Sequence, residues 1–247
     1  MKILLLVVFS FFFTLNAHSQ DKKQAIEDIL NILSTQYGLK IYYTEIPVST
    51  WGNSVTAEVA TIEDYEKLLT YLQLFKEEWQ KYTPSYIKKT GVKEIVFCKS
   101  VAYNGQRRAA IPDCYKEILY YDFLLGNHNP TYQRHVVHHE YYHMIEEQRF
   151  GNTYYKDPQW AAFNEPTFQY GAGGASQRGS NQYPMTHPQK GFINLYSTAG
   201  LEEDKAEIYA MLFTESERAK VMPWLAEDDI LRKKVDYMQK TIDELFK

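Results

Sequence analysis

The sequence has little cysteine, no excess of positive charge and no internal apolar run long enough to cross a membrane. Its 247 residues carry 27 Lys and Arg against 31 Asp and Glu, a formal net charge of −4. Without a basic excess to neutralise a phosphate backbone, we expect no nucleic-acid binding. No G-x-S-x-G or C-x-x-C segment occurs, which argues against a serine-hydrolase elbow and a cysteine metal site. The composition, 45% hydrophobic and 23% charged, is that of a globular protein.

The one long apolar run lies at the N-terminus and has the pattern of a signal peptide. Lys2 precedes an almost unbroken apolar run over 3–15, and Ala17 and Ser19 are the small residues of a cleavage site before Gln20. The run is short for a membrane span, and a retained anchor is the alternative. We predict a signal peptide over 1–19, a mature chain over 20–247 without a transmembrane span, and a secreted or periplasmic location.

Export changes the meaning of the two cysteines, Cys98 and Cys114. They are an even number in an oxidising compartment, so a disulfide between them is expected. Two buried free thiols are the alternative.

Hydrophobic periodicity predicts an α+β fold with a small mixed sheet packed on helices. The expected helices are 22–37, 61–83, 129–150, 201–214 and 227–246, and the expected strands are 40–45, 94–101 and 117–123. Between 152 and 200 lies a long irregular stretch, which in a compact protein is usually functional or contains missed structure. No internal repeat and no linker-like change of composition interrupts 20–247, so a single domain is expected there.

The expected helix 129–150 contains the segment His139-Glu140-x-x-His143. Residues four apart stack on one helical face, so two imidazoles can converge on one metal ion. Glu140 is rotated by about 100° from His139, which suits a general base better than a ligand. Two imidazoles, one carboxylate and an open water position are the layout of a catalytic zinc, which lowers the pKa of the bound water.

A third ligand is expected from the helix 201–214. Glu203 and Glu207 are four residues apart, so the first can bind metal while the second holds the other ring nitrogen of a ligand imidazole. Glu202 competes with Glu203 as the ligand, but it has Ala206 rather than an acid four residues later. The helix dipole favours acids in a first turn, which explains Glu202 and Glu203 singly but leaves Glu207 unexplained.

These motifs resemble the gluzincin metallopeptidases, and most closely the anthrax lethal factor catalytic domain and related zinc-binding peptidases of bacterial surfaces. The resemblance covers roughly 117–215 and implies a zincin-like fold. It implies that His139, His143 and Glu203 bind Zn²⁺ and that Glu140 is the general base. Tyr196 lies seven residues before Glu203, at the position where that group has an oxyanion-stabilising tyrosine. Glu207 then corresponds to the outer partner of His139.

Other residues could be mistaken for parts of the site. His135 lies on the same helix four residues before His139, but helix geometry rotates its side chain away from the face that carries the ligands. His138 is expected at the solvent or at the edge of the core, and His187 is a candidate for the substrate side. Aromatic residues between 160 and 170 indicate core packing or loop anchoring. The run Gly171–Gly174 lacks the Lys and the strand–loop–helix context of a phosphate-binding loop.

Two functions fit the pattern. The first is a secreted zinc endopeptidase that cleaves peptides or proteins, with the strand 117–123 lining the cleft and pairing with substrate. The alternative is an exported binding or surface-interaction module with a structural zinc, which has no need of Glu140. A zinc hydrolase of non-peptide amides or esters also fits. The pattern gives no indication of the oligomeric state.

Overall fold

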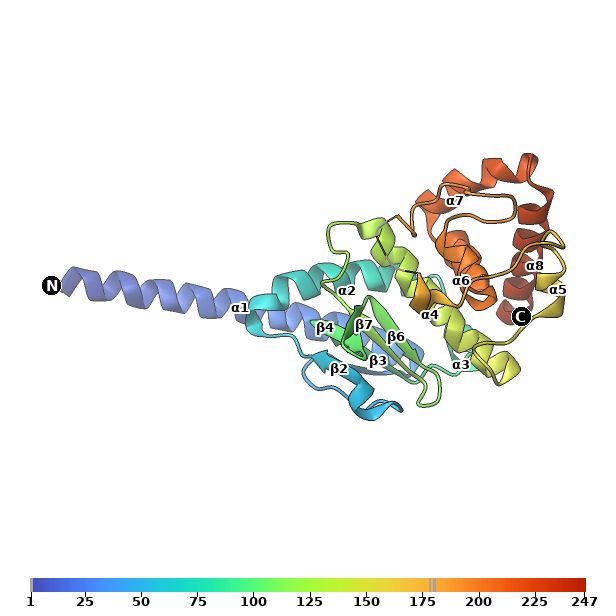
Figure 1. Ribbon diagram of the computed structural model, residues 1–247. Coiled ribbons are helices and arrows are strands. Elements are labelled where there is room, and N and C mark those ends of the chain that lie inside the picture. The colour runs from blue at the N-terminus through green and yellow to red at the C-terminus, as the bar shows by residue number, and fades with distance from the viewer. Residues whose placement is uncertain (1, 178, 180) are drawn as a thin grey trace.

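The computed structural model describes residues 2–177, 179 and 181–247, with 2–19 described by their backbone alone. Its helices are α1 (Lys2–Tyr37), α2 (Tyr65–Trp79), α3 (Pro84–Lys89), α4 (Pro130–Phe150), α5 (Pro158–Ala161), α6 (Leu201–Phe213), α7 (Glu215–Val221) and α8 (Asp229–Phe246). Its strands are β1 (Lys40–Tyr42), β2 (Val55–Glu58), β3 (Glu94–Cys98), β4 (Ser100–Tyr103), β5 (Gln106–Arg108), β6 (Ala110–Asp113) and β7 (Ile118–Asp122). Figure 1 shows the first half of α1 extending away from the rest of the molecule. The expected signal peptide falls in this half, and its side chains lie outside the described residues.

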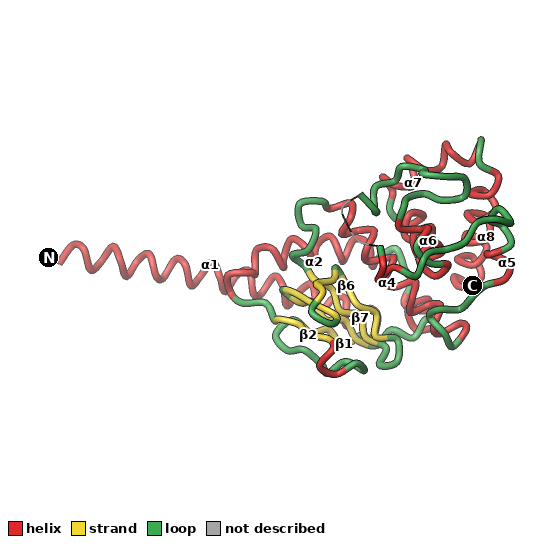
Figure 2. The backbone as a smooth tube through the Cα atoms, in the orientation of Figure 1, coloured by secondary structure: helices red, strands yellow, loops and turns green. Residues whose placement is uncertain are grey.

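Within the described part of the chain the strands form two small sheets. One has the order β1-β3-β7-β6, with β1, β3 and β7 parallel and β6 antiparallel to β7. The other is the antiparallel sheet β2-β4-β5. The expected α+β class with a small mixed sheet on helices is confirmed, as Figure 2 shows by the separation of strands and helices.

The strand expectations were incomplete. The strands β2, β5 and β6 were missed because each has only three or four residues, too few for a clear alternation of apolar and polar side chains. The expected strand 94–101 is in fact the end-to-end pair β3 and β4, which belong to different sheets.

The larger sheet has two differently covered faces, because successive strand residues point to opposite sides. One face joins the main core with α1, α2 and α4 through alternate residues of β3 and β7, namely Ile95, Phe97, Leu119 and Tyr121. The other face forms a smaller core with residues near the second sheet through Val96, Cys98, Ile118 and Tyr120. The larger apolar cluster includes α4, so the sheet supports the helix that carries the His motif.

Helix α4 lies between the sheet and the C-terminal helices, and Figure 1 shows α6 and α8 on the side of α4 away from the strands. Its ends follow local rules. The Asn129 side chain accepts a hydrogen bond from the backbone of Tyr132 at 3.2 Å, and Pro130 occupies the first turn. Gly151 ends the helix with φ of 65°, a left-handed conformation that suits glycine.

The expected disulfide is wrong, because Cys98 and Cys114 are free thiols on opposite faces of the larger sheet. Cys98 is in the smaller core, whereas Cys114 packs against the larger one, with its Sγ 3.7 Å from the carbonyl oxygen of His143. They also lie toward opposite ends of β7, since Cys98 pairs with Asp122 and the residue before Cys114 pairs with Ile118. At ~3.3 Å per residue these pairing positions are about 13 Å apart along the strand, too far for a disulfide.

The long segment 152–200 is anchored by a buried carboxylate, that of Asp204 in α6. Its Oδ2 accepts hydrogen bonds from Trp160 Nε1 at 2.8 Å, from the Tyr170 hydroxyl at 2.6 Å and from Lys234 Nζ at 2.7 Å. Lys234, in α8, also donates to the carbonyl of Gly191 at 2.8 Å. The expected anchoring role of the aromatic residues thus holds for Trp160 and Tyr170. Where side chains are described, no helix combines the length and apolarity needed to cross a membrane.

Candidate metal centre

Helix α4 brings two imidazoles of the sequence motif together. His139 and His143 are one turn apart, and their Nε2 atoms are 3.3 Å from each other. Both rings are nearly buried, with 6% and 7% of their residue surfaces exposed. The i and i+4 spacing on a helix held rigid by the sheet is what aligns these two nitrogens.

Helix α6 adds a carboxylate to these nitrogens. Glu203 lies in its first turn, and its Oε2 is 3.1 Å from His139 Nε2 and 3.7 Å from His143 Nε2. These three residues, called here the His–Glu triad, offer atoms that all lie within 4.8 Å of one another. Glu202 is not part of the triad, because its carboxylate lies beside the backbone of Gly200 and Gly173.

The spacing of the triad fits a zinc ion. Zinc–nitrogen and zinc–oxygen bonds of ~2.0–2.2 Å in a tetrahedron place the ligand atoms about 3.3–3.6 Å apart. The observed separations, 3.1, 3.3 and 3.7 Å, bracket this range. The ligand types, two neutral imidazoles and one carboxylate, are also those of catalytic zinc sites. The residues present can therefore hold this metal.

Glu140 lies on the same helix but is not in the triad. Its position next to His139 turns its side chain about 100° away from the ligand direction. Burial raises the pKa of Glu140, and the neighbouring His139 and His143 offset part of that shift. Glu140 thus interacts electrostatically with both imidazoles without being a member of the triad, as a general base requires.

Glu207 holds the opposite edge of the His139 ring. Its Oε1 lies 3.0 Å from His139 Nδ1, and its Oε2 accepts a hydrogen bond from Asn194 Nδ2. Oε1 is also 3.1 Å from His135 Nε2, while Glu217 Oε2 lies 2.6 Å from His135 Nδ1. His135, His139 and Glu207 also lie close enough together to hold an ion. We interpret Glu207, with His135, Asn194 and Glu217, as an outer layer of residues that supports the His139 ring.

Two members of this outer layer were missed by sequence reasoning. Asn194 lies in the irregular segment, where no periodicity marks it. Glu217 belongs to α7, a helix of seven residues that the sequence pattern did not predict. An acid near a lone histidine is too common to be found without the fold.

Tyr196 lies beside the triad, in the short 3₁₀-helix Tyr196–Thr198 that precedes α6. Its ring centroid is 5.8 Å from that of His139 and 5.1 Å from that of Tyr183. Its hydroxyl oxygen and Glu203 Oε1 both lie close to the backbone of Gly174. The tyrosine and the carboxylate seven residues later thus reach one site because the 3₁₀-helix leads directly into α6.

His138 and His187 lie outside the site. His138 was expected at the solvent or at the edge of the core, but it is fully buried. Its ring nitrogens contact the Tyr82 hydroxyl at 2.6 Å and Glu78 Oε2 at 2.8 Å. A neutral ring satisfies both contacts, and burial lowers the pKa of His138 to about 4. His187 belongs to neither candidate ligand group; it pairs with Asp228 at 2.8 Å and stacks on Trp224.

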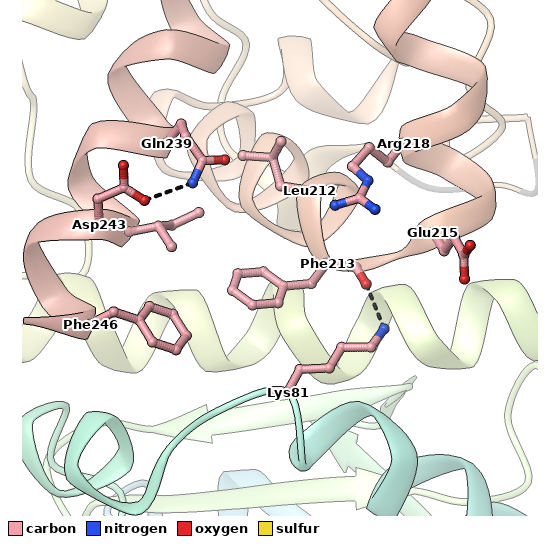
Figure 3. Close-up of a pocket in the computed structure, with 9 residues that line it drawn as sticks. Lys81, Leu212, Phe213, Glu215, Arg218, Gln239, Asp243 and Phe246 are labelled. Atoms are coloured by element: carbon pink, nitrogen blue, oxygen red, sulfur yellow. Dashed lines mark hydrogen bonds between the residues drawn. The ribbon is translucent and has the colours of Figure 1, made fainter.

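A pocket of about 440 Å³ lies at the other end of α6 from the triad. Figure 3 shows Phe213, Arg218 and Phe246 at its walls, with Lys81 donating a hydrogen bond to the Phe213 carbonyl at 2.6 Å. None of its lining residues belongs to the triad or to the outer layer.

The strand that borders α4 at the sheet edge is β6 and not the expected 117–123. Strand β7 is paired on both sides, with β3 and with β6, so it has no free edge for a peptide. Strand β6 pairs only with β7 in the four-stranded order and contacts α4.

Comparison with known proteins shows a shared fold. One solved structure, described as a putative zinc-binding metallo-peptidase from Bacteroides caccae, superposes with a TM-score of 0.53 and 15% sequence identity. The match covers 91% of this chain and 86% of the other. No family profile matches the sequence, and no curated protein matches it. The likeness extends over nearly the whole chain, so it shows that the two proteins share a fold.

Proposed function

We propose that this protein is a zinc-dependent peptidase whose metal is held by His139, His143 and Glu203. The observation that carries the proposal is the spacing of the three ligand atoms, 3.1–3.7 Å, on two packed helices. The metallo-peptidase description of the structural neighbour supports the same reading. When bound at such a site, zinc polarises a carbonyl group and lowers the pKa of a coordinated water.

The remaining residues act on protons and on orientation. The Glu140 carboxylate takes the proton of the attacking water and later delivers it to the leaving amine. The Tyr196 hydroxyl donates a hydrogen bond to the carbonyl oxygen of the substrate as negative charge develops there. The Glu207 carboxylate, 3.0 Å from His139 Nδ1, favours a proton on that nitrogen, which leaves Nε2 with a lone pair for the metal position.

The finer assignment is to the gluzincin type, similar to the lethal factor catalytic domain. It is supported by Glu203 as the acidic ligand on a second helix and by Tyr196 beside it. We assign endopeptidase activity, with an extended substrate pairing along the outer edge of β6. This edge is favoured because β6 contacts α4 and β7 has no unpaired edge.

The proposal includes export of the protein. The apolar run over 3–15 and the small residues Ala17 and Ser19 favour removal of a signal peptide over 1–19. The mature chain, 20–247, then acts outside the cytoplasm as a single domain.

The decisive experiment combines metal analysis with peptide cleavage. The purified protein should hold one zinc per chain and cleave members of an unbiased peptide pool. Glu140→Gln should keep its zinc and its melting temperature while hydrolysis falls ~10²–10⁴-fold, because only the proton acceptor is lost.

A matched pair of variants tests the ligand set. Glu203→Gln should lose stoichiometric zinc on dialysis, whereas Glu202→Gln, one residue away and outside the triad, should keep it. If Glu140→Gln cleaves peptides at the wild-type rate, the proposed general-base mechanism is wrong. If the wild-type chain holds zinc but cleaves no member of the pool, a structural zinc in a binding module takes the place of the peptidase.

A further inference from the structure

The glycine-rich run is held against the beginning of α6 by its backbone. Gly171 N donates to the carbonyl of Thr198 at 3.0 Å, and Gly173 N donates to the carbonyl of Ala199 at 2.8 Å. These acceptors lie at the end of the 3₁₀-helix that carries Tyr196, just before α6. The run therefore cannot move away from this helix start without breaking two backbone hydrogen bonds.

Gly174 follows these anchored residues and is buried against the metal centre. A Cβ atom built on Gly174 would lie 2.7 Å from the Glu203 carboxyl carbon, and closer still to Glu203 Oε1 and the Tyr196 hydroxyl. Contacts of this kind are inside van der Waals distance. The φ of Gly174 is outside the left-handed region, so the need for glycine here is one of space and not of backbone conformation.

We infer that Gly174 is a positioning residue of the metal centre, whose bare backbone sets where the Glu203 carboxylate and the Tyr196 hydroxyl can lie. This inference rests on the proposed function, since it assigns a role in that same site. The physical basis is that the hydrogen-bonded backbone at Gly174 is in contact with the ends of two functional side chains, the Glu203 carboxylate and the Tyr196 hydroxyl.

The clash of a larger residue would be relieved at the functional atoms. The backbone of the run is fixed by its hydrogen bonds to 198–199, whereas Glu203 Oε1 and the Tyr196 hydroxyl are the far ends of flexible side chains. Added volume at Gly174 should therefore displace the ligand and the oxyanion donor while the fold persists. A residue with a merely structural role would instead change the stability of the metal-free protein.

The test is Gly174→Ala in the full chain, with zinc affinity measured by competition against a chromophoric chelator. We expect zinc affinity to fall ~10–100-fold, the loss typical when the support of a metal ligand is disturbed. Peptide cleavage at saturating zinc should also fall through kcat, because the Tyr196 hydroxyl is displaced. The melting temperature of the metal-free variant should stay within a few degrees of wild type.

Gly171→Ala is the matched control from the same run. Its Cβ would meet the Ala199 carbonyl oxygen at 3.2 Å and Gln177 Nε2 at 3.5 Å, and no atom of the triad. It should lower the melting temperature modestly and leave zinc affinity within about twofold of wild type.

A double variant tests the steric cause. In Tyr196→Phe the oxygen next to Gly174 is absent, so an added methyl group has space on that side. Gly174→Ala should then lower zinc affinity at least ~3-fold less in the Tyr196→Phe background than in wild type, a coupling that contact between the residues produces.

Several results would overturn the inference. One is wild-type zinc affinity and cleavage in Gly174→Ala, and another is a large fall in the melting temperature of the metal-free variant, which would indicate a structural glycine. Strictly additive losses in the double variant would also contradict it. If the wild-type chain itself bound no zinc, the proposed function would be wrong, and this inference with it. If the wild-type chain bound zinc and Gly174→Ala had no effect, the inference alone would be wrong.

Discussion

At the scale of single residues, the candidate metal centre depends on how His139 is oriented. Its two ring nitrogens face different acids, Nε2 toward Glu203 and Nδ1 toward Glu207. An imidazole that donates through Nδ1–H carries its lone pair on Nε2, the nitrogen that faces the triad. Glu207 is itself fixed by Asn194 and by the His135–Glu217 pair, so the orientation of one ligand draws on four further side chains.

Glu207→Ala should weaken zinc affinity ~10–100-fold while Glu140 remains able to act as the base. The loss follows because His139 Nδ1 no longer has a carboxylate partner and the ring can turn. Chelator competition measures the affinity, and Glu215→Ala, on the exposed side of α7, is the control. Unchanged zinc affinity in Glu207→Ala would show that His139 is oriented by other contacts.

Tyr196→Phe should lower kcat more than it raises KM, by roughly 10–1000-fold, with zinc content unchanged. A hydroxyl that donates to the developing oxyanion stabilises the transition state and contributes little to ground-state binding. Steady-state kinetics on a peptide identified from the pool separates the two constants. Tyr183→Phe, the neighbouring ring, is the comparison, and an effect on KM alone in Tyr196→Phe would assign the tyrosine to substrate binding instead.

At the scale of elements, the sheet determines which groups can meet. Alternation along β3 and β7 divides their side chains between two cores, and this division keeps Cys98 on the face away from α4. Cys114 lies near the His143 carbonyl on the other face. Burial raises the pKa of both thiols, to about 12 for Cys114, so neither is an activated nucleophile.

The denatured, unreduced protein should therefore present two titratable thiols per chain. In the native state Cys98, which is fully buried, should react with a thiol reagent far more slowly than after unfolding, because the reagent needs an exposed thiolate. Thiol titration with and without denaturant gives both values. Absence of titratable thiol after unfolding would restore the disulfide and require a different arrangement of β3 and β6 around β7.

At the scale of the whole molecule, a buried ion pair joins the last helix, α8, to α6, the helix that carries Glu203. Lys234 and Asp204 are both fully buried, and Asp204 also accepts from Trp160 and Tyr170 of the long segment. Asp204 follows Glu203 directly in α6. Of these two adjacent acids, Glu203 faces the candidate metal centre, whereas Asp204 faces Lys234 and the anchored aromatic residues. The position of Glu203 thus depends on how α6, α8 and 152–200 pack together.

Lys234→Ala should destabilise the protein by ~3–5 kcal/mol, because it leaves the Asp204 carboxylate buried without its cation. It should also speed proteolysis within 158–192, since the same lysine holds the Gly191 carbonyl. Lys233→Ala, the adjacent and exposed residue, should cost about 0–1 kcal/mol. Urea unfolding and limited proteolysis measure both effects, and equal stability of the two variants would contradict the anchoring role.

Features that depend on local spacing could be predicted from the amino-acid sequence. The i and i+4 pairs at 139 and 143 and at 203 and 207, together with Asn129, Pro130 and Gly151 at the helix ends, are encoded within a few residues because helix geometry repeats every 3.6 residues. The α+β class also followed from periodicity. The neighbourhood of Tyr196 and Glu203 was suggested by a resemblance that depends on their separation of seven residues.

Features that depend on which distant segments pack together became visible in the folded structure alone. Strand pairing placed Cys98 and Cys114 on opposite faces, and the unpredicted strand β6 moved the free edge away from β7. Packing of the glycine-rich run against α6 gave Gly174 its place at the metal centre, although the run has no metal-binding pattern of its own. Such contacts join residues that are far apart in the chain, and no local periodicity specifies them, because their energy comes from burial and hydrogen bonding in the assembled fold.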